Sequence, residues 1–177
     1  ASRGRNVPLV AGLRVAQRER LRNFIQRRAD CCVDAYVCVS QGVADVAREH
    51  GRLPREKLHV IPNGIDGKRV ATVAPADLTA FGILPLQKVV MFVGRLHRQK
   101  GVDVLIRAAS IVLAQRPDVT CLIVGDGPEE ARLRQLAEAA VLPGQIKFAP
   151  WQADSLSLMA AADVVAVPSR WEGMSNV

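Results

Sequence analysis

The stretch that decides the fold runs Val89-Val90-Met91-Phe92-Val93-Gly94-Arg95-Leu96-His97-Arg98-Gln99-Lys100-Gly101. Its first five residues are apolar and mostly β-branched or aromatic, which is typical of a strand buried on both faces. Apolar residues at helical spacing come next and predict a helix: Val102, Leu105, Ile106, Ala109 and Val112. The loop from Gly94 to Gly101 is therefore expected to join the carboxyl end of a central strand to a helix amino terminus.

This loop has the features of an anion site. Unpaired backbone N–H groups and the positive end of the helix dipole are expected to point at one spot. Arg95 and Lys100 add a planar guanidinium fork and a flexible ammonium, which together suit a diphosphate. A solvated basic loop has the same spacing, so these residues alone leave both interpretations open.

A second glycine-containing turn, Gly125-Asp126-Gly127-Pro128, follows the apolar run Val119–Val124. Small residues at the carboxyl edge of a parallel sheet let a ligand approach the backbone, which favours a binding role for Gly125 and Gly127. A tight turn with Pro128 at a helix start needs no ligand. We favour that simpler interpretation for Asp126.

Four segments, in order along the chain, resemble a known enzyme family. They are Gly94-Arg95-Leu96-x-x-x-Lys100-Gly101-Val102-Asp103, Pro117-Asp118, Ile123-Val124-Gly125-Asp126-Gly127-Pro128-Glu129, and Val167-Pro168-Ser169-x-x-Glu172-Gly173. This pattern is similar to that of the retaining, two-lobed group 1 glycosyltransferases of family 4. The resemblance covers residues 89–177, and Ile61-Pro62-Asn63-Gly64-Ile65-Asp66 resembles the close of the first lobe in the same family.

The resemblance implies roles for individual residues. Arg95 and Lys100 would contact the diphosphate of a nucleotide-sugar donor, without a metal ion or other cofactor. Glu172 would be the first Glu of a Glu-x7-Glu pair and orient the donor sugar, and the second would fall at position 180. The backbone around Gly173 and Met174 would address the sugar hydroxyls. The expected donor-binding set is therefore Gly94, Arg95, Lys100, Gly125, Gly127, Glu172, Gly173 and Met174, with Glu172, Arg95 and Lys100 serving catalysis.

Alternating periodicities predict an α/β fold with a Rossmann-like parallel sheet and helices on both faces, plus the tail of a second α/β lobe. The first part is expected to hold strands at 7–11, 36–39 and 58–61, a helix over 13–29, and a helix capped by Ser40. The second is expected to hold strands at 89–93, 119–124, 146–148 and 164–167, and helices at 102–115, 129–140 and 156–162. The expected division is the end of an acceptor lobe (1–66), a linker with one helical turn near 77–81 (67–87) and a truncated donor lobe (88–177), the GT-B arrangement.

Positive charge is concentrated at the amino terminus. The whole chain carries a formal charge of +7, and residues 1–30, with eight arginines against Glu19 and Asp30, account for +6 of it. The charge therefore belongs to this segment, and not to the region that resembles a nucleotide site. We expect these arginines to serve the acceptor or membrane side of the first lobe.

Other residue classes exclude several functions. The four cysteines have neither the spacing of a zinc site nor a histidine nearby, so we expect buried free thiols in a reducing compartment. No run approaches the roughly 20 apolar residues of a membrane span, and no signal peptide is evident, which favours a cytoplasmic protein, with residues 1–30 as a candidate peripheral membrane contact. His50, His59 and His97 are expected to be structural or incidental.

The sequence therefore predicts part of a retaining hexosyltransferase that uses a nucleotide-diphosphate sugar, a UDP-sugar in preference to a GDP-sugar, in glycan, polysaccharide or glycolipid synthesis. The sequence does not identify the acceptor, which is expected to be a glycan or a lipid. Alone, this chain is expected to be inactive and to self-associate through an uncovered sheet edge. Two alternatives remain: a noncatalytic nucleotide-binding or interaction module, and a basic nucleic-acid or anionic-membrane binder whose affinity would fall steeply with salt.

Overall fold

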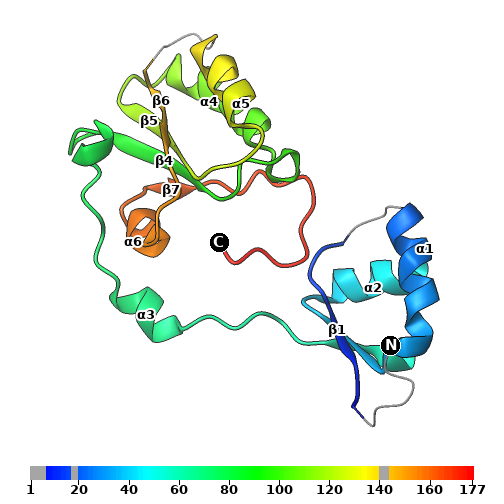
Figure 1. Cartoon of the computed structure of the whole chain (residues 1–177). Helices are drawn as coiled ribbons and strands as arrows, with labels where there is room; N and C mark the ends of the chain where they lie inside the picture. The colour runs from blue at the N-terminus through cyan, green and yellow to red at the C-terminus, as the bar shows by residue number, and fades with distance from the viewer. Residues whose placement is uncertain (1–6, 17–19, 140–143) are drawn as a thin grey trace. The chain divides into compact units, whose positions relative to one another are not determined.

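The computed structural model describes residues 7–16, 20–139 and 144–177, which form two compact units (Figure 1). Unit 1 comprises Ala1–Ile65 and Trp171–Asn176, and unit 2 comprises Asp66–Arg170 with Val177. Each unit contains one sheet, and all strand pairs of the described residues are parallel. The expected α/β class with parallel sheets is confirmed.

Unit 1 is built on a sheet of order β1-β2-β3, with β1 at Val10–Leu13, β2 at Ala35–Cys38 and β3 at Leu58–Val60. Its helices are α1 (Arg20–Ala29) and α2 (Gln41–Glu49), and short 3-10 turns cover Asp30–Cys32 and Arg55–Lys57. Tyr36 and Cys38, on one face of β2, pack with Val43 and Ala47 of α2 in the core of the unit. Leu13 of β1 and the loop residues Val33 and Leu53 complete this core between the sheet and α2.

The start of the chain differs from the expectation. Gly12 does not end the first strand, and Leu13 is its last residue and not the first of a helix, because Gly12 and Leu13 pair with Val37 and Cys38 of β2. The helix is described from Arg20, and residues 17–19 lie outside the described ranges. The predicted cap of α2 is confirmed: Ser40 accepts a hydrogen bond from the Val43 N–H at 3.3 Å.

Unit 2 has a sheet of order β6-β5-β4-β7. Its strands are β4 (Lys88–Val93), β5 (Val119–Val124), β6 (Ile146–Ala149) and β7 (Val164–Val165). Its helices are α3 (Gly67–Thr72), α4 (Val102–Leu113), α5 (Glu130–Glu138) and α6 (Ser155–Ala160), with 3-10 turns at Thr79–Phe81 and Arg98–Lys100. The expected helix end at residue 140 lies outside the described ranges.

Helices cover both faces of this sheet, as predicted. Phe92 and Ile123 face the core that contains α4 and α5. Met91 and Leu122, their neighbours in sequence, face the opposite core, where Leu158 of α6 packs. Alternate residues of the two central strands are thus buried on opposite sides, which explains why β4 and β5 have continuous apolar sequences.

The segment expected to be a linker contains more structure than predicted. The 3-10 turn at Thr79–Phe81 matches the expected helical turn, but helix α3 was not anticipated. Its start is capped by Asp66, whose side chain accepts hydrogen bonds from the N–H groups of Lys68 and Arg69. This segment, residues 67–87, belongs to unit 2, the unit that contains the sheet of β4 to β7.

The last residues return to unit 1. The hydroxyl of Ser40 donates to the Gly173 carbonyl at 2.8 Å, and the side chain of Asn63 donates to that of Asn176 at 2.8 Å. A β-carbon on Gly173 would overlap the Arg14 carbonyl, so only glycine allows this approach. The segment Trp171–Asn176 therefore belongs with the β1-β2-β3 sheet, whereas the expected division placed it with the second lobe.

The cysteines are free, as expected, but not all are buried. Cys38 and Cys121 lie in the cores, and burial raises the pKa of both thiols, that of Cys121 to about 12. The expectation of a buried thiol is wrong for Cys31, which is exposed, and for Cys32, which is partly exposed, because both lie on the 3-10 turn after α1. Within the described ranges no helix has the length and apolarity to cross a membrane.

Candidate functional site

The carboxyl ends of β4 and β5 meet at two glycines. Gly94 follows β4 and Gly125 follows β5, and the Gly94 N–H donates to the Val124 carbonyl at 3.0 Å. Gly125 has a φ of 135°, and a β-carbon placed there would overlap the Gly94 carbonyl. The backbone is therefore bare at the sheet edge where α/β proteins bind their ligands.

The loop from Gly94 to Gly101 is more internally bonded than expected. Six of its N–H groups already have acceptors, those of Gly94, Leu96, His97, Gln99, Lys100 and Gly101. The expectation that the loop offers a row of unpaired backbone donors is thus wrong for these residues. Part of the reason is the 3-10 turn at Arg98–Lys100, which provides acceptors for the N–H groups of Lys100 and Gly101 and is capped by the His97 side chain. The N–H groups of Gly94 and Leu96 donate instead to Val124 and Asp126 at the end of β5. His97 is therefore structural.

Arg95 keeps its donors open. Neither its main-chain N–H nor its guanidinium has a hydrogen-bond or ion-pair partner among residues 7–16, 20–139 and 144–177, and its side chain is exposed. Lys100, five residues on, lies at the end of the 3-10 turn and is partly buried. Because Arg95 also lines a pocket, it is placed to bind an anion there through both backbone and side chain.

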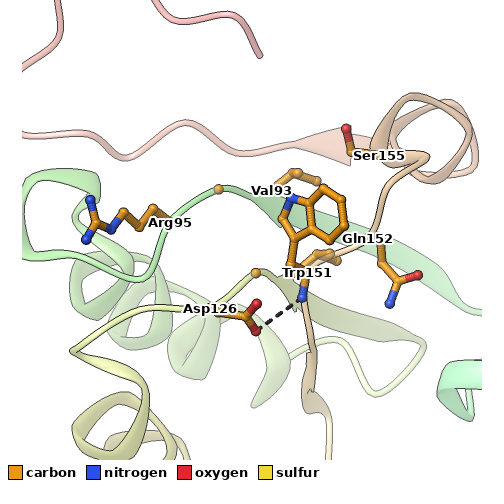
Figure 2. A pocket seen from close by; sticks show the side chains of 9 residues that line it. Val93, Arg95, Asp126, Trp151, Gln152 and Ser155 are labelled. Carbon is orange, nitrogen blue, oxygen red and sulfur yellow. Dashed lines mark hydrogen bonds between the residues drawn. The ribbon is translucent and has the colours of Figure 1, made fainter.

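Beside Arg95 lies a pocket of about 410 Å³ (Figure 2). The ends of three adjacent strands line it: Val93, Gly94, Arg95, Val124, Gly125, Asp126, Trp151, Gln152 and Ser155. The indole of Trp151 occupies the middle of the view, and the Arg95 side chain extends from the opposite side, away from the indole (Figure 2). Trp151 is 67% exposed, so much of its apolar surface is available for a flat ligand to contact.

Asp126 fixes the position of Trp151. Its carboxylate accepts a hydrogen bond from the Trp151 main-chain N–H at 3.2 Å. The Asp126 carbonyl also accepts from the Leu96 N–H at 2.8 Å, so one residue ties the turns after β4 and β6 to the turn after β5. This agrees with the structural role favoured from the sequence.

Sequence reasoning missed the contribution of β6. Trp151, Gln152 and Ser155 were not among the candidate residues, although they follow a predicted strand. The signal that could have found them is their position, because the loop after β6 reaches the same sheet edge as the loops after β4 and β5. An exposed tryptophan at such an edge is a further indication of a binding surface.

Three of the candidate residues belong to unit 1 and not to the unit that contains the pocket. Glu172, Gly173 and Met174 are part of unit 1, where the Met174 sulfur accepts a hydrogen bond from the Asn63 N–H at 3.3 Å. The pocket in unit 2 thus brings together Gly94, Arg95 and Gly125. Gly127 approaches the Leu96 backbone and is not among the residues that line the pocket.

The described residues contain no group of three or more His, Cys, Asp or Glu side chains able to hold a metal ion. That donor binding needs no metal stays a prediction. Of the other histidines, His50 ends α2 and donates its backbone N–H to the Val46 carbonyl, and His59 lies exposed in β3.

Two sequence models of protein families match the chain. The model of glycosyl transferases group 1 matches residues 77–177, and that of glycosyltransferase family 4 matches residues 1–69. The chain belongs to the group 1 glycosyltransferases. The resemblance read from its four motifs is thereby confirmed.

Curated relatives of this glycosyltransferase chain are longer than the chain itself. The lipopolysaccharide core biosynthesis glycosyltransferase LpsE of Rhizobium meliloti is 34% identical, over 81% of this chain and 40% of its own length. A GDP-mannose-dependent phosphatidylinositol monomannoside mannosyltransferase of Corynebacterium glutamicum is 36% identical, over 64% of this chain and 31% of its own length. The chain thus spans less than half of either relative.

Solved structures agree on the fold. The Anabaena protein HepE, in complex with UDP and glucose, has a TM-score of 0.76 and 25% identity. The match covers 92% of this glycosyltransferase chain and 46% of HepE.

Proposed function

We propose that this chain is part of a retaining hexosyltransferase that takes its sugar from a nucleotide diphosphate, in glycan, polysaccharide or glycolipid synthesis. The observation that carries the proposal concerns Arg95, whose main-chain N–H and guanidinium have no hydrogen-bond partner among the described residues. Both lie beside a pocket of about 410 Å³ at the carboxyl edge of the unit 2 sheet. A diphosphate leaving group gains negative charge in the transition state, and a cation held at the sheet edge stabilises that charge.

The pocket supplies a place for the rest of the nucleotide. In this proposal the base lies against the Trp151 indole, where stacking on an aromatic face is favourable for any base. The bare backbone of Gly94 and Gly125 gives the ribose and phosphates room to approach. Arg95 then binds the diphosphate, with Lys100 as the second cation.

The donor is proposed to be a UDP-sugar, and no metal or other cofactor takes part. HepE is described with UDP and glucose, and the Corynebacterium relative is GDP-mannose-dependent, so both bases occur among related proteins. Glu172 is proposed to orient the sugar, with the backbone of Gly173 and Met174 addressing its hydroxyls. The acceptor class is proposed to be a glycan or lipid, as in the relative named for lipopolysaccharide core synthesis.

A titration of the chain with UDP, GDP, uridine and guanosine tests the proposal. We expect a nucleoside diphosphate to bind more tightly than its own nucleoside, because the phosphates meet Arg95 and Lys100, and UDP to bind more tightly than GDP. Isothermal titration calorimetry or chemical-shift changes at the Trp151 indole N–H would measure both differences. Equal affinity of diphosphate and nucleoside, or no binding of either, would refute the assigned site.

The same chain is expected to transfer no sugar. Holding donor and acceptor in reactive geometry accounts for many orders of magnitude in rate, and in the family this takes two walls of a cleft. This chain spans 40% of LpsE. Donor hydrolysis and transfer to a panel of glycan and lipid acceptors, measured by product chromatography, should stay at background. Transfer by the 177-residue chain would show that the inactivity proposed here is wrong.

We also propose a peripheral membrane contact through residues 1–30, to which α1 contributes apolar side chains. Leu21, Phe24 and Ile25 lie on one side of this helix at 73%, 55% and 59% exposure, and the Arg28 guanidinium lies 5.5 Å from the Phe24 ring centre. Exposed apolar residues beside arginines are typical of helices that lie on anionic lipid surfaces.

The measurement for this contact is co-sedimentation with vesicles of phosphatidylglycerol or of phosphatidylcholine alone. A basic residue near an anionic surface contributes about 1 kcal/mol, so neutralising Arg14, Arg18 and Arg22 together should lower binding to the anionic vesicles by roughly a hundredfold. Nucleotide affinity should not change. Equal binding to both vesicle types, or loss of nucleotide binding in the triple variant, would contradict the proposal. Sedimentation without vesicles tests the self-association expected through an edge of the unit 2 sheet.

A further inference from the structure

The turn that carries Lys100 is fastened to the segment that follows β7. The Arg170 main-chain N–H donates to the Gln99 carbonyl at 2.8 Å, and its Nη1 donates to the Arg98 carbonyl at 2.7 Å. Two consecutive carbonyls of the Arg98–Lys100 turn thus have the same residue as partner. Arg170 lies 72 residues from Arg98 in sequence, so the contact is tertiary and not local.

The same guanidinium also binds Asp103, in the first turn of α4. Nη1 lies 2.9 Å from Oδ1, and Nη2 lies 2.8 Å from Oδ2, which is the paired geometry that only arginine offers. Asp103 is 7% exposed, and hydrogen bonds from Arg170 hold the pKa of its carboxyl below the usual range. A buried carboxylate needs such a partner, because an unpaired buried charge is strongly unfavourable.

Gly101 closes the arrangement on its other side. It adopts a left-handed conformation with a φ of 65°, between the 3-10 turn and α4. A β-carbon there would overlap the Pro168 carbonyl. The backbones of residues 98–101 and 168–170 are therefore in contact. In sequence, Lys100 is preceded by the two residues whose carbonyls bind Arg170 and is followed by α4, whose first turn Arg170 also binds.

We propose that Asp103 and Arg170 are positioning residues for the diphosphate site. They hold the Arg98–Gly101 turn against residues 168–170, so that Lys100 is fixed where it meets the phosphates together with Arg95. This rests on the proposed function. Neither residue touches the nucleotide in this scheme. Asp103 and Arg170 are not among the residues that line the pocket beside Trp151, so they act on binding through the phosphates alone.

The test compares a nucleoside diphosphate with its nucleoside. Arg170→Lys keeps the positive charge but loses the paired hydrogen bonds, and Asp103→Asn keeps the shape but loses the negative charge. Arg116→Lys is the control, because Arg116 also makes two hydrogen bonds to one carboxylate, from Nε and Nη2 to Asp118 at 2.9 and 2.8 Å, on the surface and outside the turn. Each variant and the parent chain are titrated with UDP and uridine, or GDP and guanosine if the parent chain prefers them.

We expect Arg170→Lys and Asp103→Asn each to lower diphosphate affinity by about tenfold and leave nucleoside affinity unchanged. Arg116→Lys should change neither. Unchanged diphosphate affinity in the folded variants, or an equal loss for diphosphate and nucleoside, would overturn the positioning role while leaving the proposed function intact. If the parent chain binds no nucleoside diphosphate, both the proposed function and this inference fall. Should Arg170→Lys fail to fold, Asp103→Asn, which keeps the shape of the side chain, decides the question.

Discussion

Gly125→Ala is expected to destabilise unit 2 by roughly 2 to 6 kcal/mol and to abolish nucleotide binding at ordinary concentrations. A φ of 135° costs an alanine about 1 to 3 kcal/mol, and relieving the overlap of its β-carbon with the Gly94 carbonyl costs about 1 to 3 more. The strain falls where β4 and β5 leave the sheet, so any relaxation displaces the turn that carries Arg95. Urea unfolding followed by Trp fluorescence measures the first effect, and UDP titration the second.

Gly67→Ala is the control for this substitution. Gly67 is the first residue of α3, also in unit 2, and a β-carbon there meets nothing within 4 Å. Alanine should leave the free energy of unfolding unchanged or raise it by about 0.4 to 1 kcal/mol, because it restricts the unfolded chain. Equal stability of the Gly125 and Gly67 variants would show that the close approach at Gly125 is not obligatory.

The double variant Arg95→Ala/Lys100→Ala is expected to lower nucleoside diphosphate affinity by about a hundredfold or more. Each charge-assisted contact contributes roughly 1.5 to 3 kcal/mol, which is about tenfold or more for each cation. Each single variant should show about half of the effect on the free-energy scale. Calorimetric titration with UDP, compared with uridine, separates this loss from any change in the base pocket.

Lys68→Ala/Arg69→Ala removes the same charge from unit 2 at exposed positions of α3 and serves as the control. It tests whether the net charge of the unit, and not the position of two cations, controls affinity. If both double variants bind UDP as the parent does, the phosphates do not lie at the Gly94–Gly101 loop. If both lose affinity equally, the effect is a general electrostatic one.

Strongly apolar segments made the central sheet predictable. The strand expected at 119–124 matches β5, and that expected at 89–93 differs from β4 by one residue. Both strands are buried on two faces, so tertiary packing and local pattern agree. Agreement was poorer where the pattern was weak: α3 begins at Gly67 without helical periodicity, and only the Asp66 cap marks its start.

The site was predictable only where its residues lie close in sequence. Gly94 and Arg95 follow a single strand, and their pattern suffices to place them at its end. Trp151 reaches the pocket through a third strand, and the Arg170–Asp103 pair joins residues 67 apart, which no local pattern reveals. The internal hydrogen bonds of the Arg98–Lys100 turn were also hidden, because a turn that satisfies its own donors looks like an open loop in sequence.

Unit 1 is discontinuous: its sheet comes from the first 65 residues and its last segment from Trp171–Asn176, with all of Asp66–Arg170 between them. During synthesis the three strands leave the ribosome well before the segment that bonds to Ser40 and Asn63 exists. Bringing Trp171–Asn176 back to the sheet of unit 1 costs chain entropy that grows with the logarithm of the number of residues between them. This cost is smaller when Asp66–Arg170 has folded into a compact unit than when it is a flexible chain. Unit 1 can therefore gain these last hydrogen bonds only after all of Asp66–Arg170 has been made.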